Sequence, residues 1–403
     1  MKLTIGIEKK LIVMNEWIEI STPSLRGNEI KYLTECITSN FVSTVGPFIN
    51  RFEEEVSIKI GIDKNKTVAT SSGTAALQLG LISVGVKPND LVVIPSYTFI
   101  ATANAISYIG AKPWIMDIES KYLTLNPLDL EKELEKHTYA KDNQRFHKST
   151  HQRIACIVPV FVFGHSPDLN SISNICKQYS IPILIDSACG IGSKHDNKNI
   201  GQLGIPGIIS FNGNKTITSG SGGIFFSHND SEIKFVRHLA STAKISNKYD
   251  HDMVGFNYRM SNIQAALGLA QLEQLENILK EKKEIHNLYR NKFYNSNFFS
   301  LINSPEWSQS SFWINFLMIK DEYIDKSSDL IKFLNDNHIR INYFWKPIPF
   351  QDPYLNLIKS ESAKKNIHIQ QKLIPLPSTA TLKKIDQIKV INLINKFFKN
   401  NYS

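Results

Sequence analysis

Three short segments of the chain carry residues whose types and spacing could do chemistry. Lys215 lies in a small polar turn, residues 212–216, directly after an apolar run. An amine that is partly desolvated in such a turn becomes a nucleophile toward carbonyl groups. Asp186 follows a second apolar run, residues 183–185, and burial of its carboxylate is costly unless a cation pairs with it. Taken alone, Lys215 is more commonly a solvated surface lysine, and Asp186 caps a loop about as often.

The third segment, residues 71–77, has small residues (SSGTAAL) between an apolar run and a helical pattern. Small residues at a strand-to-helix turn expose backbone N–H groups, and the N-terminus of a helix attracts anions. Thr74 could add a hydroxyl donor to such an anion site. The simpler interpretation is an ordinary helix cap by Ser72 or Thr74.

Taken together, the three segments indicate one kind of cofactor site, which none of them indicates alone. A helix N-terminus for a phosphate, an aspartate for a pyridinium nitrogen and a lysine for an aldehyde are the parts that a pyridoxal-phosphate enzyme requires. The 29 residues between Asp186 and Lys215 (215 − 186) leave room for one strand, so both side chains can reach one pocket. Other phosphate-binding loops do not fit. A Walker A loop needs glycine where Ile209 stands, and Phe225 occupies the last glycine position of a GxGxxG motif.

The elements that must position these residues alternate between strands and helices, which predicts an α/β fold with a largely parallel sheet. Apolar runs predict strands at residues 67–70, 91–95, 113–116, 155–160, 183–185, 208–211 and 223–227. Helical patterns cover residues 74–84, 100–108, 129–136 and 170–178. Ligands of such sheets bind beyond the carboxyl ends of the strands, which is where Asp186 and Lys215 stand.

The second part of the chain predicts a smaller domain. Residues 137–153 are polar and basic without a period, so we expect an exposed loop there. A long helical pattern, residues 262–291, links the large domain to the small one. The small domain is expected to contain a strand at 311–320 and helices at 327–337 and 382–398. We therefore divide the chain into a large cofactor-binding domain, residues 1–275, and a small C-terminal α/β domain, residues 276–403.

Composition excludes several classes of protein. The chain has 46 Lys and Arg against 37 Asp and Glu, but this net charge of +9 is spread out, so it favours an anionic partner without indicating nucleic-acid binding. The four cysteines form no CxxC pair, and we expect neither a metal site nor a disulfide scaffold. Residues 1–17 lack the apolar run of a signal peptide, and no run approaches the roughly 18 residues of a membrane span. We expect a cytoplasmic protein with no membrane partner.

Longer motifs identify a family. Over residues 18–394 the chain resembles the DegT/DnrJ/StrS sugar aminotransferases, which have the aspartate-aminotransferase fold, known as fold type I. The matching stretches include FVSTVGPFINRFEEE, SSGTAALQLGL, PSYTFIATANAI, PVFVFGHSPDL, LIDSACGIGS, SFNGNKTITSGSGG and GFNYRMSNIQAALGLAQLEQL. Each stretch alone is unspecific, but their combination is highly specific.

The resemblance implies a role for eight residues. Lys215 would be the catalytic residue that binds pyridoxal 5′-phosphate covalently, and Asp186 would pair with its pyridine nitrogen. The other cofactor contacts would be Gly73, Thr74 and Ser210 at the phosphate, Phe99 stacked on the ring and Cys189 beside the phenolic oxygen. Asn257, in GFNYRM, matches a residue that reaches the phosphate of the neighbouring subunit's cofactor. This match implies a homodimer.

Two positions depart from the family pattern. Cys189 stands where many members have Gln, Glu or His, and a thiol is only a weak hydrogen-bond donor. Ser221 replaces the acid of the family's GEGG segment. In contrast, Lys215 is retained, which argues against the dehydratase branch of the family, where histidine replaces this lysine.

The resemblance also implies a reaction, in which L-glutamate donates an amino group to C4 of a nucleotide-linked 4-keto-6-deoxy hexose. FVSTVGPFINRFE and VFGHSPD look most like enzymes of legionaminic-type nonulosonic acid pathways, which use a UDP-linked N-acetyl sugar. GNKTITSG also resembles perosamine synthases, which use GDP-4-keto-6-deoxymannose, so both acceptors stay open. A non-catalytic cofactor-binding regulator is a further alternative. The intact Lys215 and Asp186 weigh against it, and no helix-turn-helix pattern flanks the domain.

Overall fold

The computed structural model describes residues 17–246 and 248–402. The expectation about a signal peptide concerns the N-terminal residues, and residues 1–16 lie outside the described range. In the part of the chain that is described, no helix is both long enough and apolar enough to cross a membrane.

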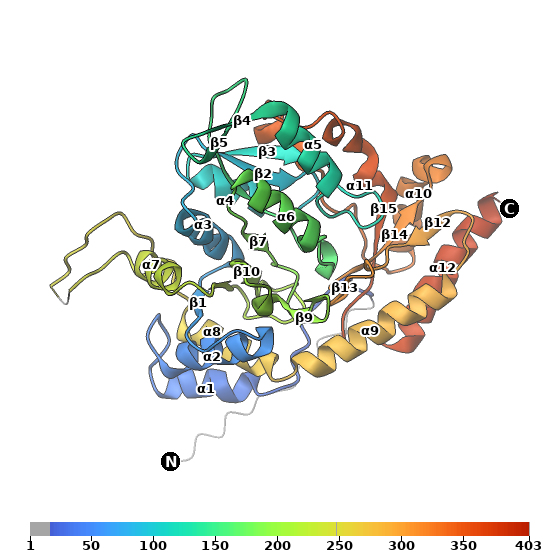
Figure 1. The fold of residues 1–403 in the computed structure, drawn as a ribbon. Helices are drawn as coiled ribbons and strands as arrows, with labels where there is room; N and C mark the ends of the chain where they lie inside the picture. Colours follow the sequence, from blue (N-terminus) through green and yellow to red (C-terminus); the bar gives the residue numbers. More distant parts are fainter. Residues whose placement is uncertain (1–16, 247, 403) are drawn as a thin grey trace, which may run out of the picture.

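The central sheet consists of two hydrogen-bonded groups of strands (Figure 1). One group runs in the order β3 (Lys112–Met116), β2 (Leu91–Pro95) and β6 (Ile154–Ile157), all parallel. The other runs in the order β7 (Ile185–Asp186), β10 (Gly207–Ser210), β11 (Gly223–Phe226) and β1 (Thr67–Thr70). Parallel bridges from Ile157 to Ile183 and from Val160 to Asp186 join the two groups.

The predicted parallel sheet is confirmed with one exception. Strand β11 is antiparallel to both of its neighbours, β1 and β10, whereas β7 and β10 are parallel to each other. Strands β1, β7 and β10 therefore point the same way, and their carboxyl ends lie at one edge of the sheet. This edge carries the three segments whose chemistry the sequence indicates.

Helices cover both faces of the sheet. Side chains of a strand alternate between faces, and β2 shows this alternation clearly. Leu91 and Val93 pack with one pair of helices, whereas Val92 and Ile94 pack with three others. The pair is α5 (Pro127–His137) and α6 (Leu169–Tyr179), and the three are α3 (Gly73–Ser83), α4 (Ala101–Tyr108) and α7 (Asp230–Ala240).

Three more helices, α1 (Glu29–Thr38), α2 (Pro47–Ile60) and α8 (Asn262–Leu272), pack together below β1 in Figure 1. The prediction of one helix over residues 262–291 was wrong, because the structure has two: α8 and α9 (Leu275–Lys292). Buried apolar residues continue across the break at Leu269, Leu272, Leu275 and Ile278. The hydrophobic pattern therefore conceals the end of α8.

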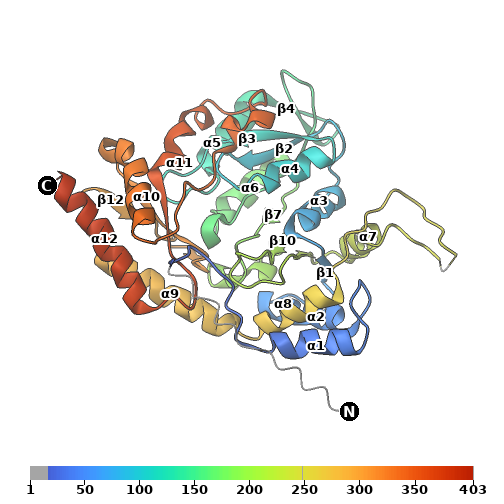
Figure 2. The same ribbon diagram turned by 180° about the vertical axis from the view of Figure 1, so that it is seen from behind.

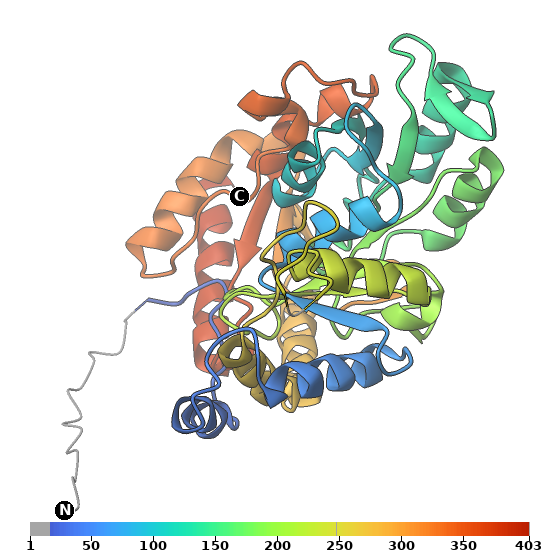
Figure 3. The same ribbon diagram turned by 90° about the vertical axis from the view of Figure 1, so that its left-hand side faces the viewer.

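The C-terminal elements lie along one side of the rest (Figure 3). An antiparallel sheet has the order β12 (Phe299–Leu301), β14 (Asn315–Ile319) and β15 (Leu373–Leu376), and it packs with α9, α10 (Ser327–Asp336) and α12 (Lys384–Tyr402). Shorter elements are β8 (Lys194–His195), β9 (Lys198–Asn199), β13 (Ser308–Gln309) and α11 (Ile369–Lys372). The mixed α/β character expected for this region is confirmed. The domain boundary at residue 275 stays a prediction.

Residues 137–153 do not form a plain loop, so that prediction was wrong. They contain an antiparallel hairpin of β4 (Thr138–Lys141) and β5 (Gln144–His147), which projects at the top of Figure 2. Asp142 and Asn143 at its tip have φ angles of 50° and 57°. A two-residue hairpin turn of this type needs positive φ at both positions, and Asp and Asn tolerate it. The Asp–Asn pair was the overlooked signal.

Candidate active site

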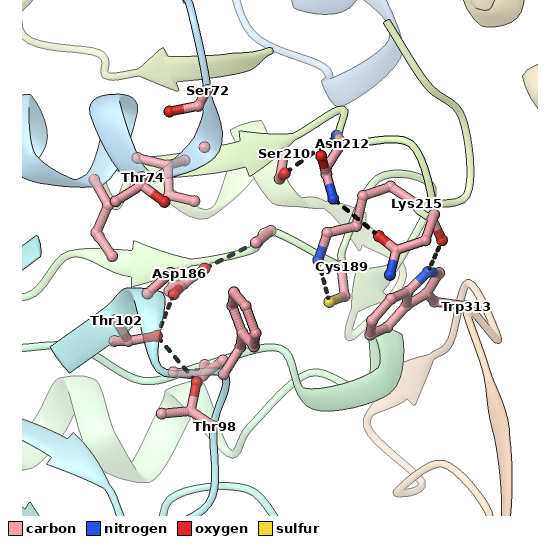
Figure 4. A pocket seen from close by; sticks show the side chains of 18 of the residues that line it. Ser72, Thr74, Thr98, Thr102, Asp186, Cys189, Ser210, Asn212, Lys215 and Trp313 are labelled. Atoms are coloured by element: carbon pink, nitrogen blue, oxygen red, sulfur yellow. Dashed lines mark hydrogen bonds between the residues drawn. The ribbon is translucent and has the colours of Figure 1, made fainter. Parts of the chain in front are cut away.

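A cavity of about 270 Å³ opens at the carboxyl ends of β1, β7 and β10 (Figure 4). Seven of the eight predicted site residues line it: Gly73, Thr74, Phe99, Asp186, Cys189, Ser210 and Lys215. Residues that are as far apart as 73 and 215 in sequence thus meet in one place, because the strands that precede them are parallel.

Asp186 ends β7 and is buried, with only 4% of its surface exposed. Its Oδ2 accepts a hydrogen bond of 2.8 Å from the Thr102 hydroxyl, and its Oδ1 accepts one of 3.1 Å from the Ala188 N–H. Thr102 in turn lies 3.0 Å from the Thr98 hydroxyl. Because the Thr102 proton is directed at Asp186, Thr98 acts as the donor in that second bond.

Burial raises the pKa of Asp186, and the bonds from Thr102 and Ala188 and the nearby Lys215 charge only partly oppose it. A carboxylate in a site of low polarity is stabilised by a cation close to it. The cavity in front of Asp186 therefore favours a ligand that presents a positive charge to this carboxylate.

The turn before α3 is built as a helix cap and also leaves donors free. Ser72 accepts a hydrogen bond of 3.1 Å from the Ala75 N–H, so the capping interpretation is confirmed. The N–H groups of Gly73 and Thr74 belong to the first turn, which has no acceptor within the helix, and both residues line the cavity. A Cβ on Gly73 would lie 2.7 Å from the Cβ of Ser210. Only glycine lets α3 approach β10 this closely, and the result is a cradle suited to an anion.

Lys215 follows β10 and extends its amine into the cavity (Figure 4). Its Nζ donates a hydrogen bond of 3.1 Å to Cys189 Sγ and lies 4.3 Å from the centre of a Trp313 ring. Burial raises the pKa of the Cys189 thiol, with the Lys215 charge opposing the shift. A neutral thiol therefore faces the amine, and the departure at Cys189 places sulfur directly beside the catalytic candidate.

Two predicted residues lie at the margin of the site. Phe99 lines the cavity with 49% of its surface exposed, and its ring centre is 5.7 Å from that of Trp345. Its predicted stacking on a cofactor stays a prediction. Asn257 is exposed and does not line this cavity; its backbone forms a bridge with Ser241. Its role in a neighbouring subunit also stays a prediction.

Sequence reasoning missed several residues of the cavity, above all Thr102 and two tryptophans, Trp313 and Trp345. A signal existed for Thr102, because it stands in the first turn of a predicted helix next to the PSYTF motif. Trp313 lies in a strand-like stretch, where an aromatic residue is ordinarily core. Its contact with Lys215 appears only when the C-terminal region packs against the turn after β10.

These side chains fit pyridoxal phosphate. The buried Asp186 suits a protonated ring nitrogen, the Gly73–Thr74 turn with Ser210 suits a phosphate, and the Lys215 amine suits an aldehyde. The fold and this set of groups define a pyridoxal-phosphate enzyme of fold type I.

The chain belongs to the DegT/DnrJ/EryC1/StrS aminotransferase family, which matches residues 23–395. It is therefore a pyridoxal-phosphate-dependent sugar aminotransferase, as the sequence motifs predict. It is 32% identical to the GDP-perosamine synthase of Vibrio cholerae, covering 94% of this chain and 99% of that protein. It is also 32% identical to a putative pyridoxal phosphate-dependent aminotransferase, EpsN, of Bacillus subtilis, over 96% and 97% of the two chains.

The name of a third relative refers to a UDP-linked sugar. The UDP-4-amino-4,6-dideoxy-N-acetyl-beta-L-altrosamine transaminase of Campylobacter jejuni is 28% identical over 92% of this chain and 96% of that protein.

Among solved structures, the aminotransferase PseC of Helicobacter pylori superposes with a TM-score of 0.84 at 22% identity, covering 96% of this chain and all of that one. This likeness confirms the aspartate-aminotransferase-like fold.

We predict that Thr102→Val weakens the binding of pyridoxal phosphate by about tenfold, since a hydrogen bond to a buried charge is lost and the carboxylate of Asp186 becomes less stable. Absorbance titration of the cofactor-free protein measures the affinity. Ser107→Ala is the matched control, because this α4 hydroxyl donates to the Ala103 carbonyl instead of to Asp186. Wild-type affinity in Thr102→Val would contradict the assigned role of the Thr102–Asp186 bond.

We predict that Gly73→Ala lowers the same affinity by at least about tenfold, because the added methyl group must push α3 away from β10. Gly213→Ala is the control, since the nearest atom to a Cβ there is 3.8 Å away. If Gly73→Ala binds the cofactor like the wild type, the phosphate does not sit at this turn.

Proposed function

We propose that this protein transfers the amino group of L-glutamate to C4 of a nucleotide-linked 4-keto-6-deoxy hexose, and that Lys215 is the catalytic residue. The observation that carries the proposal is the meeting of Lys215, Asp186 and the Gly73–Thr74 turn in one cavity. Membership of a sugar aminotransferase family supports the class of acceptor.

The residues of the cavity divide the work between them. When bound, pyridoxal phosphate supplies an electron sink for the carbon that loses a proton. Asp186 keeps the ring nitrogen charged, the Gly73 and Thr74 N–H groups and the Ser210 hydroxyl hold the phosphate, and Phe99 covers the ring. Cys189 would be the residue beside the phenolic oxygen.

Lys215 is the group that moves the proton. Its Nζ would take the proton from the α-carbon of the amino donor as a base and then give that proton up as an acid. The reverse transfer occurs at C4 of the sugar. The amine projects into the cavity from a turn that its own backbone holds, with the Lys215 N–H donating to the Asn212 carbonyl at 3.0 Å.

Two acceptors are consistent with this chemistry. The motifs of the chain favour a UDP-linked 4-keto-6-deoxy N-acetyl sugar of a nonulosonic acid pathway, and the C. jejuni relative supports the UDP form. The greater identity to the V. cholerae GDP-perosamine synthase favours the alternative, GDP-4-keto-6-deoxymannose. In either case the product is a 4-amino sugar for a surface polysaccharide or glycan.

We also propose that the protein acts as a homodimer in the cytoplasm. Asn257 is exposed and outside the cavity of its own chain, which leaves it available to a neighbouring subunit. The loop before it exposes Ile245, Tyr249, Met253 and Val254, and exposed apolar side chains of this kind are suited to a subunit contact.

The direct test is an assay of the purified enzyme with L-glutamate and each keto-sugar in separate reactions. We predict formation of 2-oxoglutarate and a 4-amino sugar with one nucleotide form at a rate at least about tenfold higher than with the other. Mass spectrometry of each reaction over time measures both products, 2-oxoglutarate and the 4-amino sugar.

Lys215→Ala serves as the control and should show neither reaction. Turnover by Lys215→Ala would contradict the catalytic role of this lysine. A wild-type enzyme that binds pyridoxal phosphate but aminates neither sugar would contradict the proposed acceptor class and favour a non-catalytic role.

A further inference from the structure

Lys282 on α9 is buried, with 3% of its surface exposed, although the next residue, Lys283, is exposed. Its Nζ donates hydrogen bonds to two backbone carbonyls, of Trp313 at 3.0 Å and of Ser378 at 2.7 Å. Burial lowers the pKa of Lys282 to about 7. Burying an amine in such a site costs free energy, so the two carbonyls that Lys282 binds indicate why it is buried there.

The two carbonyls lie just beyond the paired part of two neighbouring strands, before the start of β14 and after the end of β15. In the ladder of β14 and β15, Asn315 pairs with Leu376. The same antiparallel register would pair residue 313 with residue 378, but the ladder ends before them. Lys282 bridges the fork between the strands, and it satisfies two carbonyls that the sheet leaves without partners.

Trp313 is held at every polar group it has. Its N–H donates to the Phe163 carbonyl at 3.2 Å, its carbonyl accepts from Lys282, and its indole N–H donates to the Asn214 carbonyl at 2.5 Å. Only 1% of its surface is exposed. These three bonds hold the backbone and the indole of Trp313 against the turn that carries Lys215.

The face of this indole meets the amine of Lys215, 4.3 Å from a ring centre (Figure 4). An ammonium group over an aromatic face is attracted to it, and a lysine on a flexible four-carbon stem gains a preferred direction. Small displacements of a reacting group lower the rate strongly, because reaction needs a narrow range of geometry.

We propose that Lys282 is a positioning residue for catalysis, which fixes the indole of Trp313 and through it the amine of Lys215. This inference rests on the proposed role of Lys215. It assigns to the C-terminal region a part in the chemistry beyond that of covering the cavity.

The experiment follows the covalent attachment of pyridoxal phosphate to the cofactor-free protein. Borohydride reduction at timed intervals and peptide mass spectrometry give the rate of attachment at Lys215. We predict that Lys282→Met slows this rate about tenfold and lowers kcat with glutamate by a similar factor, with little change in KM.

Tyr289→Phe is the matched control. Tyr289 lies two turns further along the same face of α9 and is equally buried, and its hydroxyl donates to the Pro377 carbonyl at 2.9 Å, next to Ser378. It does not bond to Trp313. Loss of the Tyr289 hydroxyl should lower the unfolding temperature as Lys282→Met does. The attachment of pyridoxal phosphate to Lys215 should stay at the wild-type rate.

Trp313→Leu and the double variant with Lys282→Met complete a cycle. If Lys282 acts through the indole, Trp313→Leu also slows attachment about tenfold, and adding Lys282→Met slows it no further. Trp313→Leu tests the proposal even where Lys282→Met fails to fold.

Three results overturn the inference: wild-type attachment in Trp313→Leu, wild-type attachment in a folded Lys282→Met, or full additivity in the double variant. Each leaves Lys282 with a purely structural role. Failure of the proposed role of Lys215 gives a different result, because the wild-type protein itself then shows no attachment at Lys215.

Discussion

The burial of Asp186 at the end of β7 is the constraint on which the rest of the site depends. Burial raises the pKa of this carboxyl, which is only 4% exposed, and a cation in front of it favours the ionised form. Hydrogen bonds from Thr102 and Ala188 orient the carboxylate toward the cavity but leave its charge without a full counterpart. A protonated pyridine nitrogen supplies that counterpart, which explains why the site suits pyridoxal phosphate.

The other groups take their places from the same sheet edge. The parallel direction of β1, β7 and β10 brings the Gly73 turn, Asp186 and Lys215 to the same edge of the sheet. The C-terminal region closes the cavity with Trp313, and α9 holds that tryptophan through Lys282. The amine of Lys215 therefore lies between a neutral thiol, Cys189, and an aromatic face.

Much of this arrangement can be predicted from sequence, because it is encoded locally. Apolar runs predict β1 and β2 at their observed bounds, since buried strands need little else, and Asp186 directly follows such a run. The break between α8 and α9 cannot be predicted in this way, because the buried leucines continue across it. The hairpin tip at Asp142 and Asn143 could have been predicted from its turn residues.

The residues that act at long range could not be predicted. Trp313 is core by every local criterion, and only the packing of distant segments places its face against Lys215. Lys282 stands near Lys280 and Lys283 in a charged helix, where a solvated lysine is the ordinary expectation. Its burial depends on a fork between two strands more than thirty residues away.

Asp186 is proposed to pair with a protonated ring nitrogen, and the protonation of that nitrogen can be measured directly. Nitrogen NMR of the protein loaded with pyridoxal phosphate labelled at the ring nitrogen reports whether that nitrogen carries a proton. We predict a protonated nitrogen in the wild type near neutral pH and a neutral one in Asp186→Asn. A neutral nitrogen in the wild type, or the same signal in both proteins, would contradict it.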